Sequence, residues 1–238
     1  IHLALEMGNS RFAYYQSLFG FGKITGIDLP GETTGIVYGD RMTTIDAACN
    51  SFGQTINVNM MQMMAAYCSI INGGMLYQPH IVKRIESANG EVVKEYKANL
   101  VRQTITASTS KLLRRYLKNT VEEGTAKKAG VTGYSVAGKT GTAQKGDRKD
   151  NKWIISFIGH APAENPKFAI YVVIDEPYGT TGTSGSSADV LTLTHNILEK
   201  LLPYMNVYKD ASDEYEDTSS SPDELTVDGI PAGTASSN

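Results

Sequence analysis

The hydrophobic residues in the second half of the chain gather in three short stretches with the pattern of β-strands. These stretches cover about residues 134–144, 152–160 and 167–175. The first alternates apolar and polar positions, and the second is rich in β-branched and aromatic residues. The connections between them are short, and short connections join antiparallel neighbours. We therefore predict three consecutive strands of an antiparallel sheet.

Five other stretches show the apolar spacing or the end signals of α-helices. Asn59, followed three residues later by Gln62, predicts a capping box at the start of one helix, and Gly73-Gly74 predicts its end. Another helix is expected to bury one face, formed by Leu112, Leu113, Tyr116, Leu117 and Val121. The predicted helices cover about 11–19, part of 40–49, 60–72, 109–123 and 186–202, with Pro203 beyond the last.

A β-hairpin is predicted between the third and the fourth of these helices. Residues 81–85 and 91–96 have the composition of short strands. They flank Asn89-Gly90, the dipeptide that favours a tight hairpin turn.

Composition divides the chain into a globular part and an acidic tail. The 238 residues are 41% hydrophobic, which is enough for one substantial core. The net charge is −3, but residues 206–238 hold eight acids and one lysine, which leaves +4 on the rest. We predict a domain over 1–205 and a disordered acidic tail or linker over 206–238. A charge of +4 is too small to indicate a nucleic-acid partner.

Several classes of protein are not indicated by the residue content. Only Cys49 and Cys68 occur, so there is no disulfide-rich pattern. No apolar run has the length of a membrane span, and no signal peptide is visible. The histidines lack metal-ligand spacing, so we predict no metal site; they are His2, His80, His160 and His195.

The segment around Lys139 admits two interpretations. Gly133-x-x-x-x-Gly138-Lys139-Thr140 fits the P-loop pattern of nucleotide-binding proteins, and residues 169–176 resemble the acid-ending strand that holds Mg²⁺ in such proteins. Lys139-Thr140-Gly141 is also the third signature of penicillin-binding proteins and serine β-lactamases, in which it lies on a strand.

Local chemistry favours the strand. A P-loop needs a helix directly after its lysine, but Gly141, Gly146 and the polar residues up to Asn151 forbid a long one. No helix fits between Lys139 and Asp175, so the crossover of a P-loop fold is missing. We therefore expect Lys139 to project from the first of the three predicted strands.

Further sequence blocks accompany this motif. They include Phe19-Gly20-Phe21-Gly22, and they fall in residues 19–32, 51–54, 62–67, 71–74, 123–126, 136–144 and 156–162. In this order the blocks resemble the transpeptidase domain of class B, high-molecular-weight penicillin-binding proteins of the division or sporulation type. The resemblance covers residues 1 to about 203.

The resemblance implies an α+β fold of the β-lactamase and transpeptidase type, present as a partial domain, with an antiparallel sheet and helices packed on its faces. It implies serine acyl transfer on peptidoglycan stem peptides that end in D-Ala-D-Ala, with β-lactams as mimics. Its catalytic residues would be Lys139, which supplies a positive charge, and Thr142, whose amide donates to an oxyanion. Its substrate-binding residues would be Thr140, Gly141 and Thr142.

The nucleophile is expected to lie outside this chain. In relatives the Ser-x-x-Lys and Ser-x-Asn motifs precede the Phe-Gly-Phe-Gly block, whereas this chain opens at Ile1. Ser108-x-x-Lys111 and Ser87-x-Asn89 match these patterns literally, but in the wrong place. Ser108 is better explained as a helix cap, and Ser87 as part of the hairpin. We therefore predict no nucleophile in this chain, and no activity for the chain alone.

The resemblance leaves two other functions open. A β-lactamase or β-lactam sensor shares the Lys-Thr-Gly strand, and a truncated scaffold could bind stem peptides without catalysis. No cofactor is implied, and the possible protein partners belong to a division or elongation complex. The parent protein is expected on the extracytoplasmic face of the bacterial cytoplasmic membrane, held by an N-terminal anchor outside this chain.

Overall fold

The structure is a computed structural model that describes residues 1–147, 149, 151–177 and 186–210. Its central element is a three-stranded antiparallel sheet, in the order β5 (Ala137–Lys145), β6 (Lys152–Ala161) and β7 (Phe168–Asp175). The register between β5 and β6 runs without a bulge from Ala137 opposite His160 to Lys145 opposite Lys152. The three predicted strands and their antiparallel pairing are therefore confirmed.

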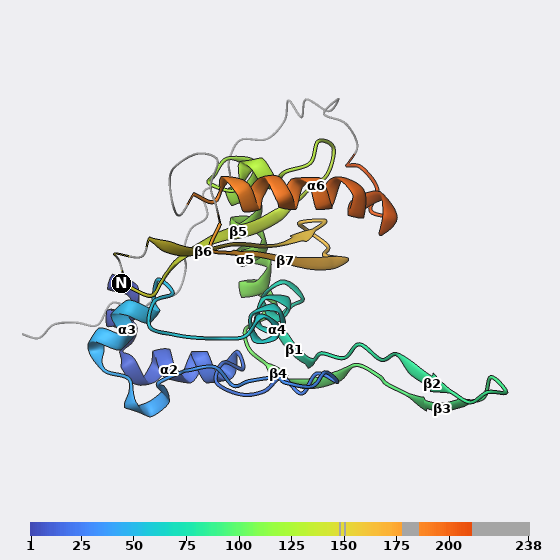
Figure 1. Cartoon of the computed structure of the whole chain (residues 1–238), viewed down its shortest axis with the longest axis horizontal. Helices are drawn as coiled ribbons and strands as arrows, with labels where there is room; N and C mark the ends of the chain where they lie inside the picture. Colours follow the sequence, from blue (N-terminus) through green and yellow to red (C-terminus); the bar gives the residue numbers. More distant parts are fainter. Residues whose placement is uncertain (148, 150, 178–185, 211–238) are drawn as a thin grey trace, which may run out of the picture.

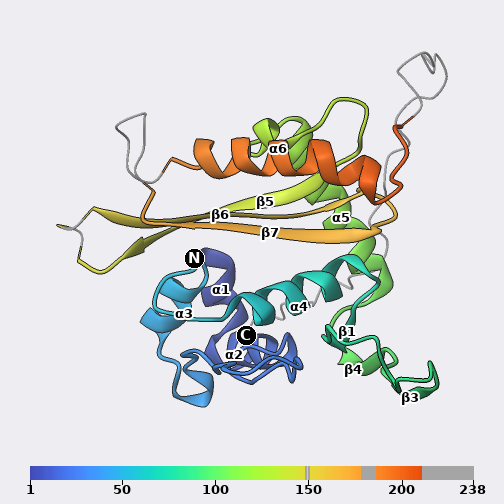
Figure 2. The same cartoon turned by 45° about the vertical axis from the view of Figure 1, so that its right-hand side comes forward.

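Helices cover both faces of the sheet (Figures 1 and 2). On one face lies α6 (Ala188–Tyr204), together with the short η2 (Lys127–Ala129). On the other face lies α4 (Met60–Ile71), and the same side of the sheet holds α1 (His2–Met7), α2 (Asn9–Leu18), η1 (Gly39–Arg41) and α3 (Thr44–Asn50). The helix α5 (Ala107–Glu122) contacts both α4 and β5, so it links the two layers.

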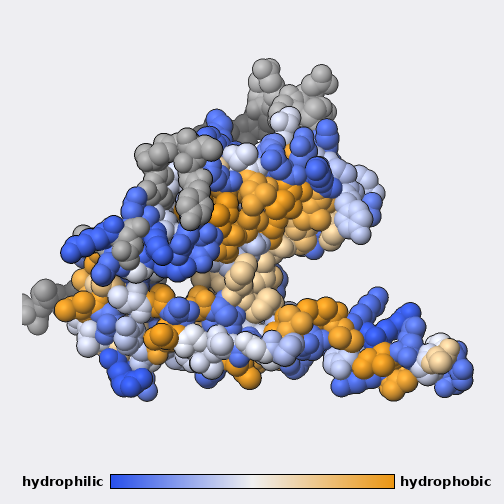
Figure 3. All heavy atoms as spheres, in the orientation of Figure 1, coloured by the Kyte–Doolittle hydropathy of each residue, from blue (hydrophilic) through white to orange (hydrophobic). Residues whose placement is uncertain are grey.

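The main hydrophobic core lies between the sheet and α6. Phe157 and Ile155 of β6 are fully buried there against Leu198 and Leu202 of α6. Val207, just after α6, is buried in the same core. The rest of the predicted tail, from residue 211, lies outside the described residues. Figure 3 shows hydrophobic side chains gathered over α6 and β7 on one face of the molecule.

The predicted capping box of α4 is confirmed. The Asn59 side chain accepts from the Gln62 amide at 2.8 Å, and Gln62 Oε1 accepts from the Asn59 amide at 2.9 Å. The Gln62 side chain is 1% exposed, and its Nε2 also donates to the carbonyls of Lys23 and Thr34. One side chain thus fixes both the start of α4 and the Gly-rich loop before it.

Two antiparallel strand pairs extend from the lower layer (Figure 1). β1 (Met75–Gln78) pairs with β4 (Asn99–Gln103), and β2 (Arg84–Glu86) pairs with β3 (Val92–Glu95). The predicted hairpin is therefore confirmed, with shorter strands than expected. Every residue of β2 and β3 is exposed.

Three details of the helix predictions are wrong. Thr106, not Ser108, caps α5, because Thr106 has the extended backbone that an N-cap needs and accepts from the Thr109 amide. Leu112 and Tyr116 are 40% and 53% exposed, because α5 bridges two layers and does not lie along one of them. Pro203 lies inside α6, where the helix continues past it with a bond from the Met205 amide to the Leu201 carbonyl.

Candidate functional site

Lys139 lies on β5, at the outer side of the sheet. In the described part of the chain β5 has one strand neighbour, β6, so its other edge carries backbone groups without a ladder partner. Such an edge can pair with an extended ligand. The P-loop interpretation is excluded, because a P-loop needs a helix directly after its lysine, whereas Lys139 stands within β5, which continues as a strand to Lys145.

The direction of the backbone groups on β5 follows from two contacts. Gly138 O accepts from the Thr120 hydroxyl of α5, and Thr140 O accepts from Lys139 Nζ, so neither carbonyl points at β6. In an antiparallel strand the N–H and C=O of one residue point to the same side, and the side alternates along the chain. The amide of Thr142, two residues after Thr140, therefore points to the outer edge.

The side chains of the motif divide between the two faces of the sheet. Thr140 and Thr142 lie opposite Phe157 and Ile155, whose side chains are in the core beneath α6. Residues directly opposite share a face, so both threonines are on the α6 face. Thr142 is exposed and Thr140 is half-buried.

Lys139 and Gly141 belong to the opposite face, which is turned toward α4. From that face the Lys139 side chain folds back to the outer edge, where Nζ donates to Thr140 O at 2.9 Å and lies 3.3 Å from the Thr140 hydroxyl. Among the described residues no carboxylate forms an ion pair with Lys139. The open edge therefore carries an exposed positive charge and, at Thr142, an outward amide.

The helix α5 anchors the start of this edge. The Thr120 hydroxyl contacts Gly138 O and also lies 2.7 Å from Leu117 O, so its single proton is shared between the two carbonyls. Gly124, at the end of the helix, lets the backbone approach Thr120, because a Cβ at Gly124 would lie 2.9 Å from Thr120 Cα. The edge beyond Gly138 remains open, since the contact with α5 falls at its first residues.

A buried hydrogen bond ties the sheet to α4 close to this strand. His160 of β6 is fully buried, and its Nε2 lies 3.1 Å from the Ala163 carbonyl, which can only accept. Nε2 therefore carries the proton, and Nδ1 accepts from the Tyr67 hydroxyl at 2.8 Å. Burial lowers the pKa of His160 to about 4 and raises the pKa of Tyr67. The pair is neutral and connects the layers at neutral pH.

The two serine motifs that match by pattern alone are far from Lys139. Ser108 is in the first turn of α5, with its hydroxyl 2.9 Å from that of Thr106. Thr120, which contacts β5, is twelve residues further, or about 18 Å along the helix axis. Ser87 is in the turn of the projecting hairpin and accepts from the Glu91 amide. Neither serine is brought to the β5 edge.

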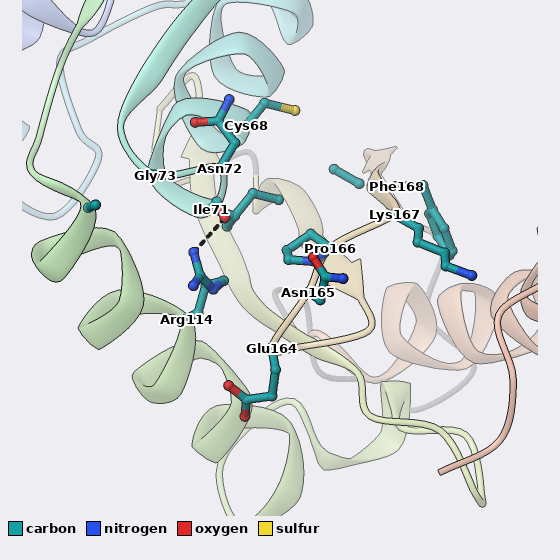
Figure 4. Close-up of a pocket in the computed structure, with 12 residues that line it drawn as sticks. Cys68, Ile71, Asn72, Gly73, Arg114, Glu164, Asn165, Pro166, Lys167 and Phe168 are labelled. Carbon is teal, nitrogen blue, oxygen red and sulfur yellow. Dashed lines mark hydrogen bonds between the residues drawn. The ribbon is translucent and has the colours of Figure 1, made fainter.

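A separate cavity of about 580 Å³ lies among the end of α4, α5 and the loop before β7 (Figure 4). Its lining includes Cys68, Asn72, Arg114 and Glu164. Arg114 Nη1 donates to the Ile71 carbonyl at 2.8 Å and so caps the C-terminal end of α4. The cavity holds none of the motif residues of β5.

Residues 1–147, 149, 151–177 and 186–210 contain neither a metal-binding cluster nor a membrane-spanning helix. No group of three or more His, Cys, Asp or Glu side chains there is placed to hold a metal ion. No helix in those ranges is long and apolar enough to span a bilayer.

The sequence analysis missed three hydroxyls beside the motif. Thr120 contacts Gly138, and the Ser156 hydroxyl lies against Gly141 with Tyr171 close to it. The strand alternation could have placed Ser156 and Tyr171 on the Lys139 face, but the register that brings Ser156 opposite Gly141 is a tertiary feature.

Comparisons with known proteins agree with this arrangement. The family described as the penicillin binding protein transpeptidase domain matches residues 1–199. Stage V sporulation protein D of Bacillus subtilis is 40% identical over 212 residues, which cover 87% of this chain and 32% of that protein. Peptidoglycan D,D-transpeptidase FtsI of Escherichia coli is 34% identical over 215 residues, which cover 88% and 34%. The chain thus spans about a third of the length of these relatives.

Solved structures show the same fold. Penicillin binding protein 3 of Mycobacterium tuberculosis, complexed with ampicillin, superposes with a TM-score of 0.79 at 31% identity, over 90% of this chain and 50% of that one. The transpeptidase domain of penicillin-binding protein 3 from Burkholderia pseudomallei gives 0.75 at 26% identity, over 88% and 62%. The predicted α+β fold is confirmed. With a family match over most of its length, a Lys-Thr-Gly strand at an open sheet edge and relatives that are transpeptidases, this chain belongs to the penicillin-binding protein transpeptidase domain family.

Proposed function

We propose that this chain forms the Lys-Thr-Gly side of a serine D,D-transpeptidase active site. The substrate would be a peptidoglycan stem peptide ending in D-Ala-D-Ala, and β-lactams would occupy the same site. The observation that carries the proposal is the open edge of β5. It combines the exposed ammonium of Lys139, which lacks a carboxylate partner in the described chain, with the outward amide of Thr142.

Each motif residue has a role in this proposal that its chemistry can fulfil. Lys139 has a third N–H besides the two directed at Thr140, and it attracts the terminal carboxylate of the peptide. The Thr142 amide donates to the oxygen that becomes negative when a serine attacks the scissile carbonyl. The Thr140 and Thr142 hydroxyls flank the edge and offer further hydrogen bonds to the ligand.

The nucleophile would come from a segment outside this chain. The serine would attack the penultimate D-Ala carbonyl, the terminal D-Ala would leave, and the amine of a second stem peptide would take up the acyl group. Relatives named as peptidoglycan D,D-transpeptidases, and a neighbour solved with ampicillin, support this assignment. We also propose that the whole protein is anchored to the membrane, works outside the cytoplasm and meets division or elongation proteins.

Labelling with a fluorescent penicillin tests the proposal in two steps. The isolated chain should give no covalent label, because Ser108 is at the far end of α5 from the β5 edge. The full-length protein should label, and Lys139→Ala should slow its acylation about 100-fold, the loss typical of one charge-stabilising group. Lys83→Ala, an exposed change in the hairpin region, is the matched control.

Three results would contradict the proposal. Stoichiometric label on the isolated chain, mapped to Ser108, would place the nucleophile in this chain. Acylation of the full-length protein that is unaffected by Lys139→Ala would remove the role of the β5 edge. Rapid hydrolysis and release of the β-lactam would favour a β-lactamase.

A further inference from the structure

The Gly141 backbone and the Ser156 side chain are in close contact on the α4 face of the sheet. Ser156 lies directly opposite Gly141 in the β5–β6 register, so both belong to the face that also carries Lys139. A Cβ built on Gly141 would lie 2.6 Å from Ser156 Oγ. The hydroxyl therefore occupies the place that a side chain at position 141 would fill, and it leans from β6 over β5, the strand at the open edge.

Tyr171 of β7 lies near this hydroxyl, on the side of Ser156 away from β5. Tyr171 lies opposite Ile158, and Ile158 lies opposite Lys139, so these three residues form a row on the same face. The Tyr171 side chain is half-buried, and its hydroxyl lies close to the Ser156 hydroxyl. Burial raises the pKa of Tyr171, so the phenol stays neutral and keeps its proton.

Hydrogen-bond counting leaves Ser156 with capacity for another partner. A serine hydroxyl has one donor and two acceptor positions, and the neighbouring Tyr171 hydroxyl can take up at most one of the three. When Tyr171 takes an acceptor position, the Ser156 O–H is free to donate to another group. No other hydrogen-bond partner of Ser156 Oγ is present among the described residues.

We propose that Ser156 is a ligand-contacting residue of the β5 site, and that it shares the carboxylate of the bound peptide or β-lactam with Lys139. A carboxylate accepts hydrogen bonds only, so it suits an ammonium on one side and a free hydroxyl donor on the other. Gly141 separates the two donors and has no side chain to block a group that crosses the strand there. Tyr171 is a positioning residue, since it acts through Ser156.

This inference rests on the proposed function, because it needs a ligand along the β5 edge. Its test uses the full-length protein and compares acylation by benzylpenicillin with acylation by the methyl ester of benzylpenicillin. The ester lacks the negative charge but keeps the reactive ring. Ser156→Ala should lower the second-order acylation rate constant for benzylpenicillin about tenfold, the cost of one hydrogen bond to a charged group.

Several matched measurements separate a ligand contact from a structural effect. For the methyl ester, Ser156→Ala should change the rate constant by less than about twofold, because the charged partner is gone. Ser156→Thr keeps a hydroxyl and should retain most of the rate, whereas Tyr171→Phe should lose about threefold through a less fixed Ser156. Ser87→Ala, a serine in the hairpin turn, should leave both rates unchanged.

The outcomes distinguish the inference from the function on which it rests. If Lys139→Ala slows acylation but Ser156→Ala does not, the inference is overturned and the proposed function stands. If Ser156→Ala slows both ligands equally, the effect is structural and the carboxylate contact is refuted. If the full-length protein is not acylated at all, both the proposed function and the inference that rests on it are refuted.

Discussion

The buried His160 should make the stability of this chain depend on pH in a window where carboxylates contribute little. His160 is fully buried, donates from Nε2 to a carbonyl and accepts at Nδ1 from Tyr67. Protonation would place a charge in the core and convert Nδ1 from an acceptor into a donor. The pKa of His160 is accordingly lowered, mainly by burial, from 6.5 to about 4.

The sign and size of the effect follow from the difference in proton binding. Between about pH 6.5 and 4 the unfolded chain binds a proton at this histidine and the folded chain does not, so the free energy of unfolding falls as the pH falls. The full shift corresponds to about 3 kcal/mol, of which about 2.5 kcal/mol is lost between pH 7 and 4.5. Carboxylates whose pKa is lowered in the folded chain reduce the free energy of unfolding only at lower pH. Asp28 is an example, because the amides of Val82 and Ile81 lower its pKa from 3.8.

Urea unfolding followed by circular dichroism, at half-unit steps from pH 7 to 4.5, measures this loss. His160→Gln keeps a neutral, hydrogen-bonding side chain that cannot be protonated in this range, so its unfolding free energy should be nearly flat. His80→Gln removes an exposed histidine, so its unfolding free energy should decline with falling pH as that of the wild type does. If the unfolding free energies of the wild type and His160→Gln fall equally with pH, protonation of His160 is not the cause of the loss of stability.

Two further predictions concern packing near the site and the loop before α4. Gly138→Ala should lower the unfolding free energy by about 3 kcal/mol, because its Cβ would lie 2.3 Å from the Phe157 ring; Gly130→Ala, with 3.3 Å to its nearest neighbour, should cost less than about 1 kcal/mol. Thermal or urea unfolding checks both, and equal losses would contradict the steric argument. Gln62→Ala should cost about 3 kcal/mol, because it removes a buried side chain, its bonds to the Lys23 and Thr34 carbonyls and half of the α4 capping box, whereas the exposed Gln103→Ala should cost little. Proteolysis of the loop at residues 20–39 should become faster in Gln62→Ala and not in Gln103→Ala. Unchanged cleavage of Gln62→Ala would argue against Gln62 as the anchor of this loop.

Local signals in the sequence were enough for the elements that position the site. Alternation and β-branched residues predicted the three strands, and Asn59 with Gln62 predicted the start of α4, because such signals act over a few residues. Gly141, Gly146 and the polar residues up to Asn151 were enough to reject a helix after Lys139, and with it the P-loop. These features depend on local backbone preferences, which a single sequence displays directly.

Features that depend on tertiary contact were not predictable in the same way. Ser156 beneath Gly141 requires the β5–β6 register, and the Thr120 contact requires α5 to cross the start of β5. Leu112 and Tyr116 were expected to be buried, because periodicity shows that a helix has an apolar face but not how much of it is covered. The role of Gly141 as a place of close ligand approach stays a prediction, and the position of the Ser156 hydroxyl beside it could not be predicted, because that position depends on the strand register.

The open margin of β5 also affects how the free protein behaves in concentrated solution. An unsaturated strand edge is a template for any extended polypeptide, including another copy of the same chain. Here the first carbonyl is occupied by Thr120 and the next by the folded-back Lys139. Antiparallel pairing of two copies about Thr140 would bring two ammonium groups together and would displace both from their carbonyls. The lysine that is suited to attract an anionic ligand thus also discourages fibrous self-association while the site is empty.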